Sequence, residues 1–479
     1  MPIPKEILSV PRPKGTVVKY ASNFYYVVKR TSVYKEGRRV PKDLGIVGKI
    51  IDGKFVEKKN VVLKNDKTID IKDFGKVAVF EKYASDVLKE LEEHFEEKDA
   101  KKLYCIAMLR CMTDELTNRD LKHEYDSNYL SVLYPNVGLS ESSIPDFLES
   151  IGMSYLQIEG FMRARVKQSA GNMAVIDGTL KSYNSSKSAF SDWSRKGRIK
   201  GSKDFGLLYS YDLIAKEPIA SKPYTGNMLD STSFIDFIDK FDHQNQLLVL
   251  DKGFWTKDTI KTMKSIEGLH YIVPIKSNSK VIQMHQLFNE MQMLDEEKNG
   301  LILYRKVCVE DKFYYAFKSM HDAHIQENAY MSSQKSKMSF NEKNYLKKKD
   351  SFGLIVFESN LDCEPIDVYY AYSERWNIEK MFDFYKNILD LSTTAVKNDY
   401  RIYATEFINF LSLLMSCKVK KVFNETNLSN SYSYKQLMRY LSKVKKCRVF
   451  DNRQTWQNSK NLKYIDRILT VLNVNNDTV

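Results

Sequence analysis

Hydrophobic and polar residues follow different patterns in successive parts of the chain. Up to about residue 80, Gly and Asp turn signals separate short runs of period two, which predict strands: VVKYASNFYYVVKRTSVY, GKIIDGKFV and KVAVFEKY. From about 81 to 170, apolar residues recur at helical spacing, as in SDVLKELEEHFEE and KKLYCIAMLRCMTDELTN. We therefore expect a β-rich N-terminal unit at 1–80 and a helical unit at 81–170.

One part of the helical unit has two interpretations. The segment from Ser140 to Glu149 has the pattern of a capped short helix that follows a turn. It could belong to a helix-turn-helix-like module, which would make 81–170 a DNA-binding domain. A helical bundle that contacts no groove explains the same pattern, and the sequence leaves both interpretations open.

Strand patterns return after residue 170 and indicate an α/β core. Strands are predicted at MAVID, QLLVLD and HYIVPIK, a hairpin at FGLLYSYDLIA with EPIASKPYTG, and a helix at SFIDFIDKF. The core resumes at FGLIVFES, continues through a helical stretch at 367–390 and closes with the apolar helix FINFLSLLMSCKV. We assign 171–280 and 352–417 to the two parts of this core.

The residues between the two parts of the core have a different pattern. Two β-type runs, LILYRKVCV and KFYYAFKSM, are joined by a short acidic turn, and a polar stretch rich in Lys and Ser follows them. We interpret 281–351 as an insertion into the core. The fold class is therefore α/β, with a β-containing insertion domain and with β-rich and helical units before the core.

The last part of the chain, 418–479, is a basic helical region. Between 418 and 448 it holds nine Lys or Arg residues against one Glu, with Tyr432, Tyr434 and Tyr440 interleaved. Such a segment suits a nucleic-acid backbone. A solvated helical face has the same composition, so both interpretations stay open.

Composition and charge narrow the class of protein. Apolar residues make up 43% of the 479, enough for several buried cores, and 74 Lys and Arg against 61 Asp and Glu give a formal charge of +13. A polyanionic partner is favoured, although many basic proteins bind none. The six cysteines lack zinc spacing, the N-terminus lacks the apolar run of a signal peptide, and we find no run of about 18 apolar residues. We expect reduced thiols and a cytoplasmic protein without a membrane span.

Two aspartates follow apolar runs of the predicted core. Asp177 ends the run AVID, and Asp251 ends the run LLVLD. Parallel neighbouring strands that end in this way would bring two carboxylates to one edge of a sheet. Either residue alone could simply be a turn residue, because Asp-Gly is a common turn dipeptide.

A third group lies in the helical stretch YSERWNIEKMFDFYK. At about 100° per residue, Tyr372, Arg375, Glu379 and Lys386 fall within roughly a 60° arc of one helix face. A structural interpretation also exists, since Arg375 and Glu379 form an i,i+4 pair that could stabilise a surface helix. Three acids without His or Cys partners suit Mg²⁺ or Mn²⁺ better than zinc.

These features together resemble the DDE transposases of the insertion-sequence-four superfamily. That family's helix signature is Tyr, two residues, Arg, three residues, Glu, six residues and Lys, and the chain matches every position. The resemblance extends to IDGT, to TGNMLD at 225–230 and to LDKGFW, covers about 175–415, and is best with the IS1634-like branch. The chain departs from the family at Lys252 and Phe254, where Arg and Tyr are usual.

The resemblance implies a fold, a site and a reaction. It implies an RNase-H-like catalytic core, a mixed sheet flanked by helices, in which Asp177, Asp251 and Glu379 are catalytic and hold two divalent ions, Mg²⁺ or Mn²⁺. Tyr372, Arg375 and Lys386 would contact DNA. The reaction would be cut-and-paste transposition of an insertion sequence, through metal-dependent DNA cleavage and strand transfer.

Partners and minor residues follow from the same resemblance. The partners would be double-stranded DNA with terminal inverted repeats and target DNA, bound by a homodimer in a synaptic complex, without a membrane, in a prokaryotic cytoplasm near the nucleoid. Trp255 or an aromatic residue of the insertion could hold a flipped base. We interpret Trp376 as core packing, and three histidines as packing or surface residues: His243, His270 and His285.

Two other functions remain compatible with the sequence. One is a domesticated DNA-binding protein that kept the fold and lost catalysis, although all three carboxylates are present. The other is an RNase-H-like, structure-selective nuclease that hydrolyses DNA without joining ends.

Overall fold

The computed structural model describes residues 3–21, 23–35, 38–57, 69–183, 192–193, 203–226, 228, 230–294, 301–336, 340–391, 393–394, 396, 398–449 and 455–474. These residues form two compact units. Unit 1 comprises Met1–Asp70 and Arg448–Trp456, and unit 2 comprises Ile71–Cys447 and Gln457–Val479. Each unit is described by itself.

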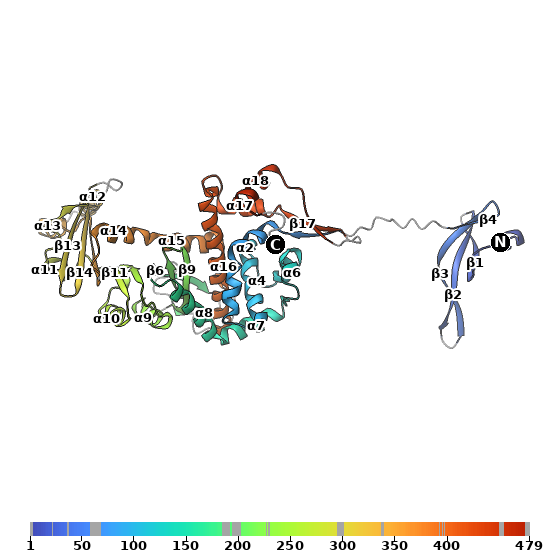
Figure 1. Cartoon of the computed structure of the whole chain (residues 1–479), viewed down its shortest axis with the longest axis horizontal. Helices are drawn as coiled ribbons and strands as arrows, with labels where there is room; N and C mark the ends of the chain where they lie inside the picture. The colour runs from blue at the N-terminus through green and yellow to red at the C-terminus, as the bar shows by residue number, and fades with distance from the viewer. Residues whose placement is uncertain are drawn as a thin grey trace. The chain divides into compact units, whose positions relative to one another are not determined.

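Unit 1 is a small antiparallel sheet with its own core. Its strands pair in the order β1 (Thr16–Ala21), β2 (Phe24–Lys35), β3 (Arg38–Ile51) and β4 (Lys54–Glu57), after a short helix α1 (Lys5–Leu8). Val10, Val18, Val27 and Ile50 are buried together on one side of the sheet. The strands predicted for this part of the chain are therefore confirmed. In Figure 1, β2 and β3 run on as a ribbon past the ends of β1 and β4.

The run KVAVFEKY, predicted as a strand, is wrong: it forms the helix α2 (Gly75–Ala84). Val77, Ala78, Val79 and Phe80 are all fully buried there. A short apolar run that is buried on every side has no polar face to reveal its period, so strand and helix cannot be distinguished from it.

The helical part of unit 2 surrounds one long helix, α16 (Asp399–Glu425). The other helices of this part are α2, α3 (Asp86–Glu92), α4 (Glu97–Met112), α5 (Leu121–Ser127), α6 (Leu130–Leu133), α7 (Ser143–Met153) and α8 (Tyr155–Gln168), and those after α2 lie in the unit where helical spacing predicted helices. A side chain at Gly152 of α7 would lie 1.9 Å from the carbonyl oxygen of Tyr400, so α7 approaches the start of α16 without a gap. Arg401 Nη2 lies 2.7 Å from Glu149 Oε2 in the same contact. This packing supports the helical-bundle interpretation of 140–149.

Helix α16 is a core helix by its burial. It is long and apolar enough to cross a membrane by length and composition, and among the described residues one helix meets that test. Of its most apolar window, 89% is buried inside the fold. The core helices of globular proteins show the same combination.

Unit 2 also contains a large mixed sheet, to which helices are packed. The strands run in the order β12-β13-β14-β15-β11-β10-β6-β8-β7, with β9 paired to β8 and β16 paired to β6. Their bounds are β6 (Met173–Tyr183), β7 (Asp192–Trp193), β8 (Lys203–Asp212), β9 (Glu217–Thr225), β10 (Leu247–Leu250), β11 (His270–Pro274), β12 (Gln292–Met293), β13 (Ile302–Val309), β14 (Lys312–Ser319), β15 (Leu354–Ser359) and β16 (Thr393–Thr394). The predicted strands and the β8–β9 hairpin are confirmed. Strands β6, β10 and β11 are parallel, whereas β6, β8 and β9 are antiparallel.

The helices of this part connect the strands and pack on the sheet. Helices α9 (Asp230–Phe241) and α10 (Lys257–Ser265) contact β8, β9 and β11, and α14 (Pro365–Glu374) and α15 (Trp376–Asp383) contact β14 and β6. The remaining elements of the sheet region are η1 (Lys252–Phe254), α11 (Lys280–Met284), α12 (Met320–Ser336), α13 (Glu342–Lys349) and η2 (Phe384–Ile388). After α16 come η3 (Leu428–Asn430), α17 (Tyr434–Leu441), β17 (Lys445–Val449), β18 (Trp456–Asn458) and α18 (Lys463–Val471). β17 pairs with β18 and with β5 (Ile69–Asp73), the strand before α2.

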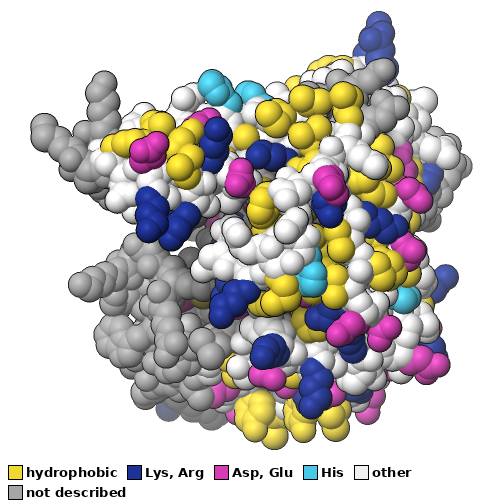
Figure 2. Space-filling model, turned by 90° about the vertical axis from the view of Figure 1, so that its left-hand side faces the viewer, with side chains coloured by type: hydrophobic (Ala, Val, Ile, Leu, Met, Phe, Trp, Pro, Cys, Tyr) yellow, Lys and Arg dark blue, Asp and Glu magenta, His cyan; other side chains and the backbone are white. Residues whose placement is uncertain are grey.

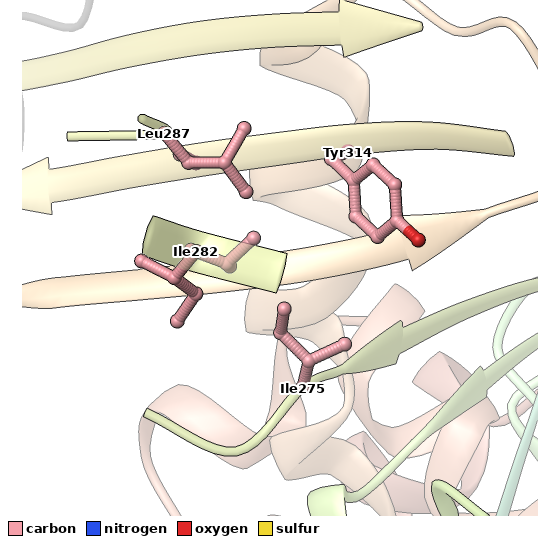
Figure 3. Packing of buried hydrophobic residues seen from close by; sticks show 6 residues of the cluster. Ile275, Ile282, Leu287 and Tyr314 are labelled. Atoms are coloured by element: carbon pink, nitrogen blue, oxygen red, sulfur yellow. The ribbon is translucent and has the colours of Figure 1, made fainter. Parts of the chain in front are cut away.

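The segment interpreted as an insertion extends the core sheet. Its two β-type runs form the predicted hairpin β13–β14. Strand β14 then pairs with β15, and β15 pairs with β11. Figure 3 shows Ile275, at the end of β11, packed with Ile282, Leu287 and Tyr314 of this segment. The hairpin and the core therefore share hydrogen bonds and a common apolar cluster.

Candidate active site

The parallel pairing of β6 with β10 brings Asp177 and Asp251 to neighbouring positions. Val175 lies opposite Val249, and Ile176 lies opposite Leu250. Both strands are buried up to Ile176 and Leu250, and the next residue of each is an aspartate. β10 ends before Asp251, whereas β6 continues to Tyr183 and pairs with β8. The prediction that Asp177 lies at a strand exit is therefore wrong, because hydrogen bonds to β8 extend the strand beyond β10.

Asp177 is a largely buried carboxylate whose pKa also responds to two other acids. Its Oδ1 accepts a hydrogen bond from the N–H of Gly178 at 2.8 Å. Burial raises the pKa of Asp177 to about 6, and Asp251 and Glu379 add to the rise, against the opposing effects of the Gly178 N–H and Arg375. A raised pKa at a cluster of acids marks a place where a bound cation would lower the energy.

Helix α15 brings Glu379 to the same place through Arg375. Arg375 Nη1 lies 3.6 Å from Asp177 Oδ2, and Nη2 lies 3.0 Å from Glu379 Oε1. The Arg375 side chain is 9% exposed. Its guanidinium therefore bridges the strand that carries Asp177 and the helix that carries Glu379.

Tyr372 and Lys386 lie on either side of this bridge in the sequence. The guanidinium carbon of Arg375 lies 5.5 Å from the centre of the Tyr372 ring, which packs on Phe357 of β15 at 4.6 Å. Lys386 donates hydrogen bonds to the Thr179 hydroxyl and to the carbonyl oxygen of Leu180, both on β6. The sequence predicted these four signature residues on one helix face. In the structure, their contacts run along β6 and β15.

The helix that carries them is not one regular α-helix. α14 ends at Glu374, α15 ends at Asp383, and the residues from Phe384 to Ile388 form a π-helical turn. The predicted arc assumed about 100° per residue throughout, and the π-helical turn at Lys386 departs from that value. Lys386 lies in this turn and contacts β6, the strand that Arg375 also contacts.

Trp376 was predicted to be packed in the core, and this is wrong. It is 55% exposed, and the Arg375 guanidinium carbon lies 5.5 Å from its ring centre. Trp255, the residue considered for a flipped base, is partly buried, and its Nε1 donates a hydrogen bond to Glu358 at 3.2 Å. Two of the histidines pack as predicted: His243 is fully buried, and His285 stacks on Tyr314.

A cavity of about 220 Å³ opens beside the two aspartates. Asp177 and Asp251 line it together with Asp230, the first residue of α9. Asp230 is not among the site residues that the sequence predicts, although it ends the TGNMLD stretch that resembles the family's. Asn227 and Leu229 of that stretch lie outside the described residues.

The donor set suits a hard divalent ion in its chemistry. Asp177, Asp251 and Glu379 offer carboxylate oxygens, which Mg²⁺ and Mn²⁺ prefer. In the part of the chain that the structure describes, however, no three His, Cys, Asp or Glu side chains are grouped closely enough to hold a metal ion. Arg375 provides the positive charge between Asp177 and Glu379 instead, so an ion would take over a role that the guanidinium now has.

A comparison with protein families assigns the chain. A family model described as "Transposase DDE domain" matches residues 170–415, just over half of the chain. The chain belongs to this transposase family. All six predicted site residues lie within the matched range.

Other comparisons add little to this assignment. No curated protein matches the chain. One similar solved structure is the cryo-EM structure of a piggyBac transposase synaptic complex with hairpin DNA, with 12% identity and a TM-score of 0.40 over 77% of this chain and 79% of that chain. The assignment to the family therefore rests on the family model.

The transposase domain contains a buried ion pair behind the site. Lys181 Nζ on β6 lies 2.8 Å from Glu406 Oε1 on α16 and 2.8 Å from the hydroxyl of Tyr385. Both charged side chains are at most 1% exposed. The pair connects the strand of Asp177 and the π-helical turn of Lys386 to the core helix. No signal in the sequence could have found it, because its two partners lie in separate apolar runs.

The basic C-terminal segment of this transposase is largely paired within the protein. Lys418 lies 2.7 Å from Asp86, Lys420 lies 4.4 Å from the ring centre of Phe384, and Tyr434 packs on that same ring. These contacts favour a structural role for part of the segment. On the face of unit 2 that Figure 2 shows, Lys and Arg side chains lie intermixed with Asp and Glu, so neither sign dominates its described part.

Proposed function

We propose that this chain is a transposase that cuts DNA at the ends of an insertion sequence and joins them to a target. Asp177, Asp251 and Glu379 would be its catalytic residues. The observation that carries the proposal is the Arg375 bridge, 3.6 Å from Asp177 and 3.0 Å from Glu379, beside the strand pair that ends in Asp251. The bridge joins Asp177 to Glu379, and the pairing of β6 with β10 supports a position of Asp251 beside Asp177.

The cofactors in this proposal are two divalent ions, Mg²⁺ or Mn²⁺, held by the three carboxylates. Bound there, they would stabilise the charge on the attacking and leaving oxygens of a phosphodiester. Asp177 would lie between Asp251 and Glu379, which agrees with its coupling to both. The protein's own part would be to hold these oxygens in fixed positions on β6, after β10 and on α15, so that a phosphate meets a preorganised site.

Arg375, Tyr372 and Lys386 would bind the DNA in this proposal. Once ions neutralise the carboxylates, the Arg375 guanidinium is released from Asp177 and Glu379 and can bind a phosphate with two parallel hydrogen bonds. Tyr372 lies beside the Arg375 guanidinium, and Lys386 donates a hydrogen bond to Thr179, two residues after Asp177 on β6. The partners would be double-stranded DNA with terminal inverted repeats and target DNA, in a homodimeric synaptic complex.

The finer classification belongs to the same proposal. The strand order β9-β8-β6-β10-β11, with β10 and β11 parallel to β6, supports an RNase-H-like core. The segment 281–351 would be its insertion domain, entered from the end of β11 and left at β15. The helix signature of Tyr372, Arg375, Glu379 and Lys386 supports the insertion-sequence-four superfamily and its IS1634-like branch.

The test is a cleavage and joining assay on duplex DNA that carries the element's own ends. We expect nicking and strand-transfer product with Mg²⁺ or Mn²⁺, no product with EDTA, and none from Asp177→Asn at any ion concentration. Asp258→Asn is the matched control, because Asp258 is an exposed aspartate of α10. Absence of nicking by the wild type over a full titration of both ions contradicts the proposal, and hydrolysis without joined product assigns a nuclease instead.

A further inference from the structure

The β2–β3 ribbon of unit 1 extends well beyond the rest of its sheet. β1 pairs with β2 only up to the pair of Thr16 with Lys29, and β4 pairs with β3 only from Gly48 onwards. Past the pair of Arg30 with Asp43, β2 and β3 pair with each other alone, as far as Lys35 with Arg38. This part is visible in Figure 1 as a two-stranded projection.

A clamp of charges closes the base of the ribbon. The carboxylate of Asp43 on β3 accepts hydrogen bonds from Arg30 Nε on β2, at 2.7 Å, and from Lys19 on β1. Arg30 first and Lys19 second hold the pKa of Asp43 at about 2, so this carboxylate stays ionised. Irregular pairing between Val27 and Arg30 accompanies the clamp, as β-bulges do where a strand pair changes its twist. The ribbon therefore leaves the sheet at a defined place.

One face of the ribbon combines cations with apolar side chains. Thr31 lies opposite Lys42, and Val33 lies opposite Val40, so these four residues share a face with Arg38, two positions before Val40. All five side chains are exposed, with Val33 at 38% and Val40 at 41%. None of these five positions is acidic. This face therefore offers positive charge and apolar contact area together.

We propose that this face of the ribbon binds B-form DNA by lying in its major groove. The major groove is about 12 Å wide and admits a two-stranded ribbon. Five paired residues at about 3.3 Å each reach roughly 17 Å, enough to cross it. Arg38 and Lys42 would meet phosphates or the acceptor edge of guanine, and Val33 and Val40 would meet thymine methyl groups.

The structure argues against a second strand as the occupant. Pro41 lies in the two-stranded part of β3, opposite Ser32. Proline lacks the N–H that a pairing strand needs, and it is a usual means of keeping an exposed edge from joining another sheet. The charge of the face also suits a polyanion better than a further copy of a chain whose formal charge is +13.

Duplex RNA is the other polyanion to be separated from DNA. Its major groove is deep and narrow, so a ribbon cannot read it. The inference rests on the proposed function only in one respect, namely that the DNA concerned is the end of the element. The binding itself needs no ions and no chemistry, and this allows the two ideas to fail independently.

The experiment measures binding by the full chain in EDTA, with fluorescence anisotropy on a labelled duplex of the element's end over a series of salt concentrations. We expect Arg38→Ala combined with Lys42→Ala to bind at least tenfold more weakly than the wild type. The slope of log K against log salt should fall by about 2, since each phosphate contact contributes about 0.9. Protection of guanine N7 from methylation, a major-groove signal, should disappear in the same variant.

Lys54→Ala is the matched control, because Lys54 is an exposed lysine of unit 1 on β4, away from the ribbon. It should keep wild-type affinity and the wild-type slope. Arg38→Lys combined with Lys42→Arg keeps the charge and should recover most of the affinity. Equal melting temperatures of all variants exclude a folding defect.

The inference is overturned if the double alanine variant binds as the wild type does, if N7 protection persists in it, or if duplex RNA competes as well as duplex DNA. Cleavage assays then separate the two ideas. If the wild type never cuts DNA, yet N7 protection disappears when Arg38 and Lys42 are replaced, the ribbon binds DNA and the proposed transposase activity is contradicted. If the double alanine variant cuts the element's ends and binds them with unchanged affinity, the proposed transposase activity stands and the inference about the ribbon is contradicted.

Discussion

Arg375 Nη2 lies 3.0 Å from Oε1 of Glu379, one helical turn further along the chain. A surface pair of this kind would contribute only about 0.5 kcal/mol. Here the arginine is 9% exposed and its other nitrogen faces Asp177, so the contact belongs to a half-buried cluster of opposite charges. The contribution of this contact to stability therefore depends on whether another cation neutralises Asp177 and Glu379.

Replacing Arg375 should destabilise the metal-free protein and sensitise it to ions. Arg375→Ala leaves Asp177 and Glu379 facing each other, and we expect the free energy of unfolding to fall by about 2 kcal/mol. Added Mg²⁺ or Mn²⁺ should then raise the melting temperature more in this variant than in the wild type. Differential scanning fluorimetry over an ion titration measures both effects.

The control for this prediction is Arg401→Ala, which breaks a partly exposed pair with Glu149 away from the site. It should cost less than about 1 kcal/mol and leave the response to ions unchanged. An equal response to ions in Arg375→Ala and in the wild type would show that the guanidinium and the ion do not share a place.

The buried pair of Lys181 and Glu406 should behave as a unit. Lys181→Met leaves Glu406 buried without its cation, and we expect a loss of about 3–5 kcal/mol in the unfolding of unit 2. Lys181→Met combined with Glu406→Leu removes both charges and should recover a large part of that loss. A double-mutant cycle by chemical denaturation measures the coupling, and purely additive losses would contradict it.

His243 should make unit 2 sensitive to acid. Burial lowers its pKa to about 4, while its Nδ1 contacts Oε1 of Gln246 at 2.7 Å. The unfolded chain, with an ordinary pKa of about 6.5, then binds the proton more readily than the folded chain. Stability contributed by the neutral ring is present above pH 6.5 and is lost as the pH falls towards 4, by on the order of 3 kcal/mol.

The measurement is the melting temperature of unit 2 between pH 8 and pH 4, compared with that of His243→Gln. The variant should be less stable at pH 8 and should lose less on acidification. Parallel curves for the two proteins would assign the acid sensitivity to other groups.

Asp230 should matter for cleavage although it lies outside the three predicted carboxylates. It lines the same cavity of about 220 Å³ as Asp177 and Asp251. We expect Asp230→Asn to slow cleavage of the element's ends at least tenfold without lowering the melting temperature, since small misplacements near reacting groups are costly. Asp239→Asn changes an exposed residue of the same helix and should have wild-type activity. Wild-type rates from Asp230→Asn would leave the cavity without a role.

The sequence predicted the local elements of the core well. The strands before Asp177 and Asp251 and the β8–β9 hairpin are marked by short apolar runs with turn residues between them, and such signals act over a few residues. The helix α2 escaped because its buried run VAVF has no polar face. The same kind of ambiguity does not arise in the long helix α16.

The parts of the site that depend on distant contacts could not be predicted. Trp376 is exposed although it lies inside an apolar helical pattern, and Lys386 lies in a π-helical turn that no composition signals. The Lys181–Glu406 pair joins residues 225 apart in the chain. Spacing along one helix therefore identified the right residues, and tertiary packing decided where they point.

The continuous sheet has a mechanical consequence. From β13 to β6 each strand is hydrogen-bonded to the next, through β14, β15, β11 and β10. A displacement of the β13–β14 hairpin would therefore be passed through successive hydrogen-bonded strands to β6, the strand of Asp177, because among the described residues no flexible linker lies between them in this strand order. A substrate bound to that hairpin would thereby influence the position of the Asp177 carboxylate.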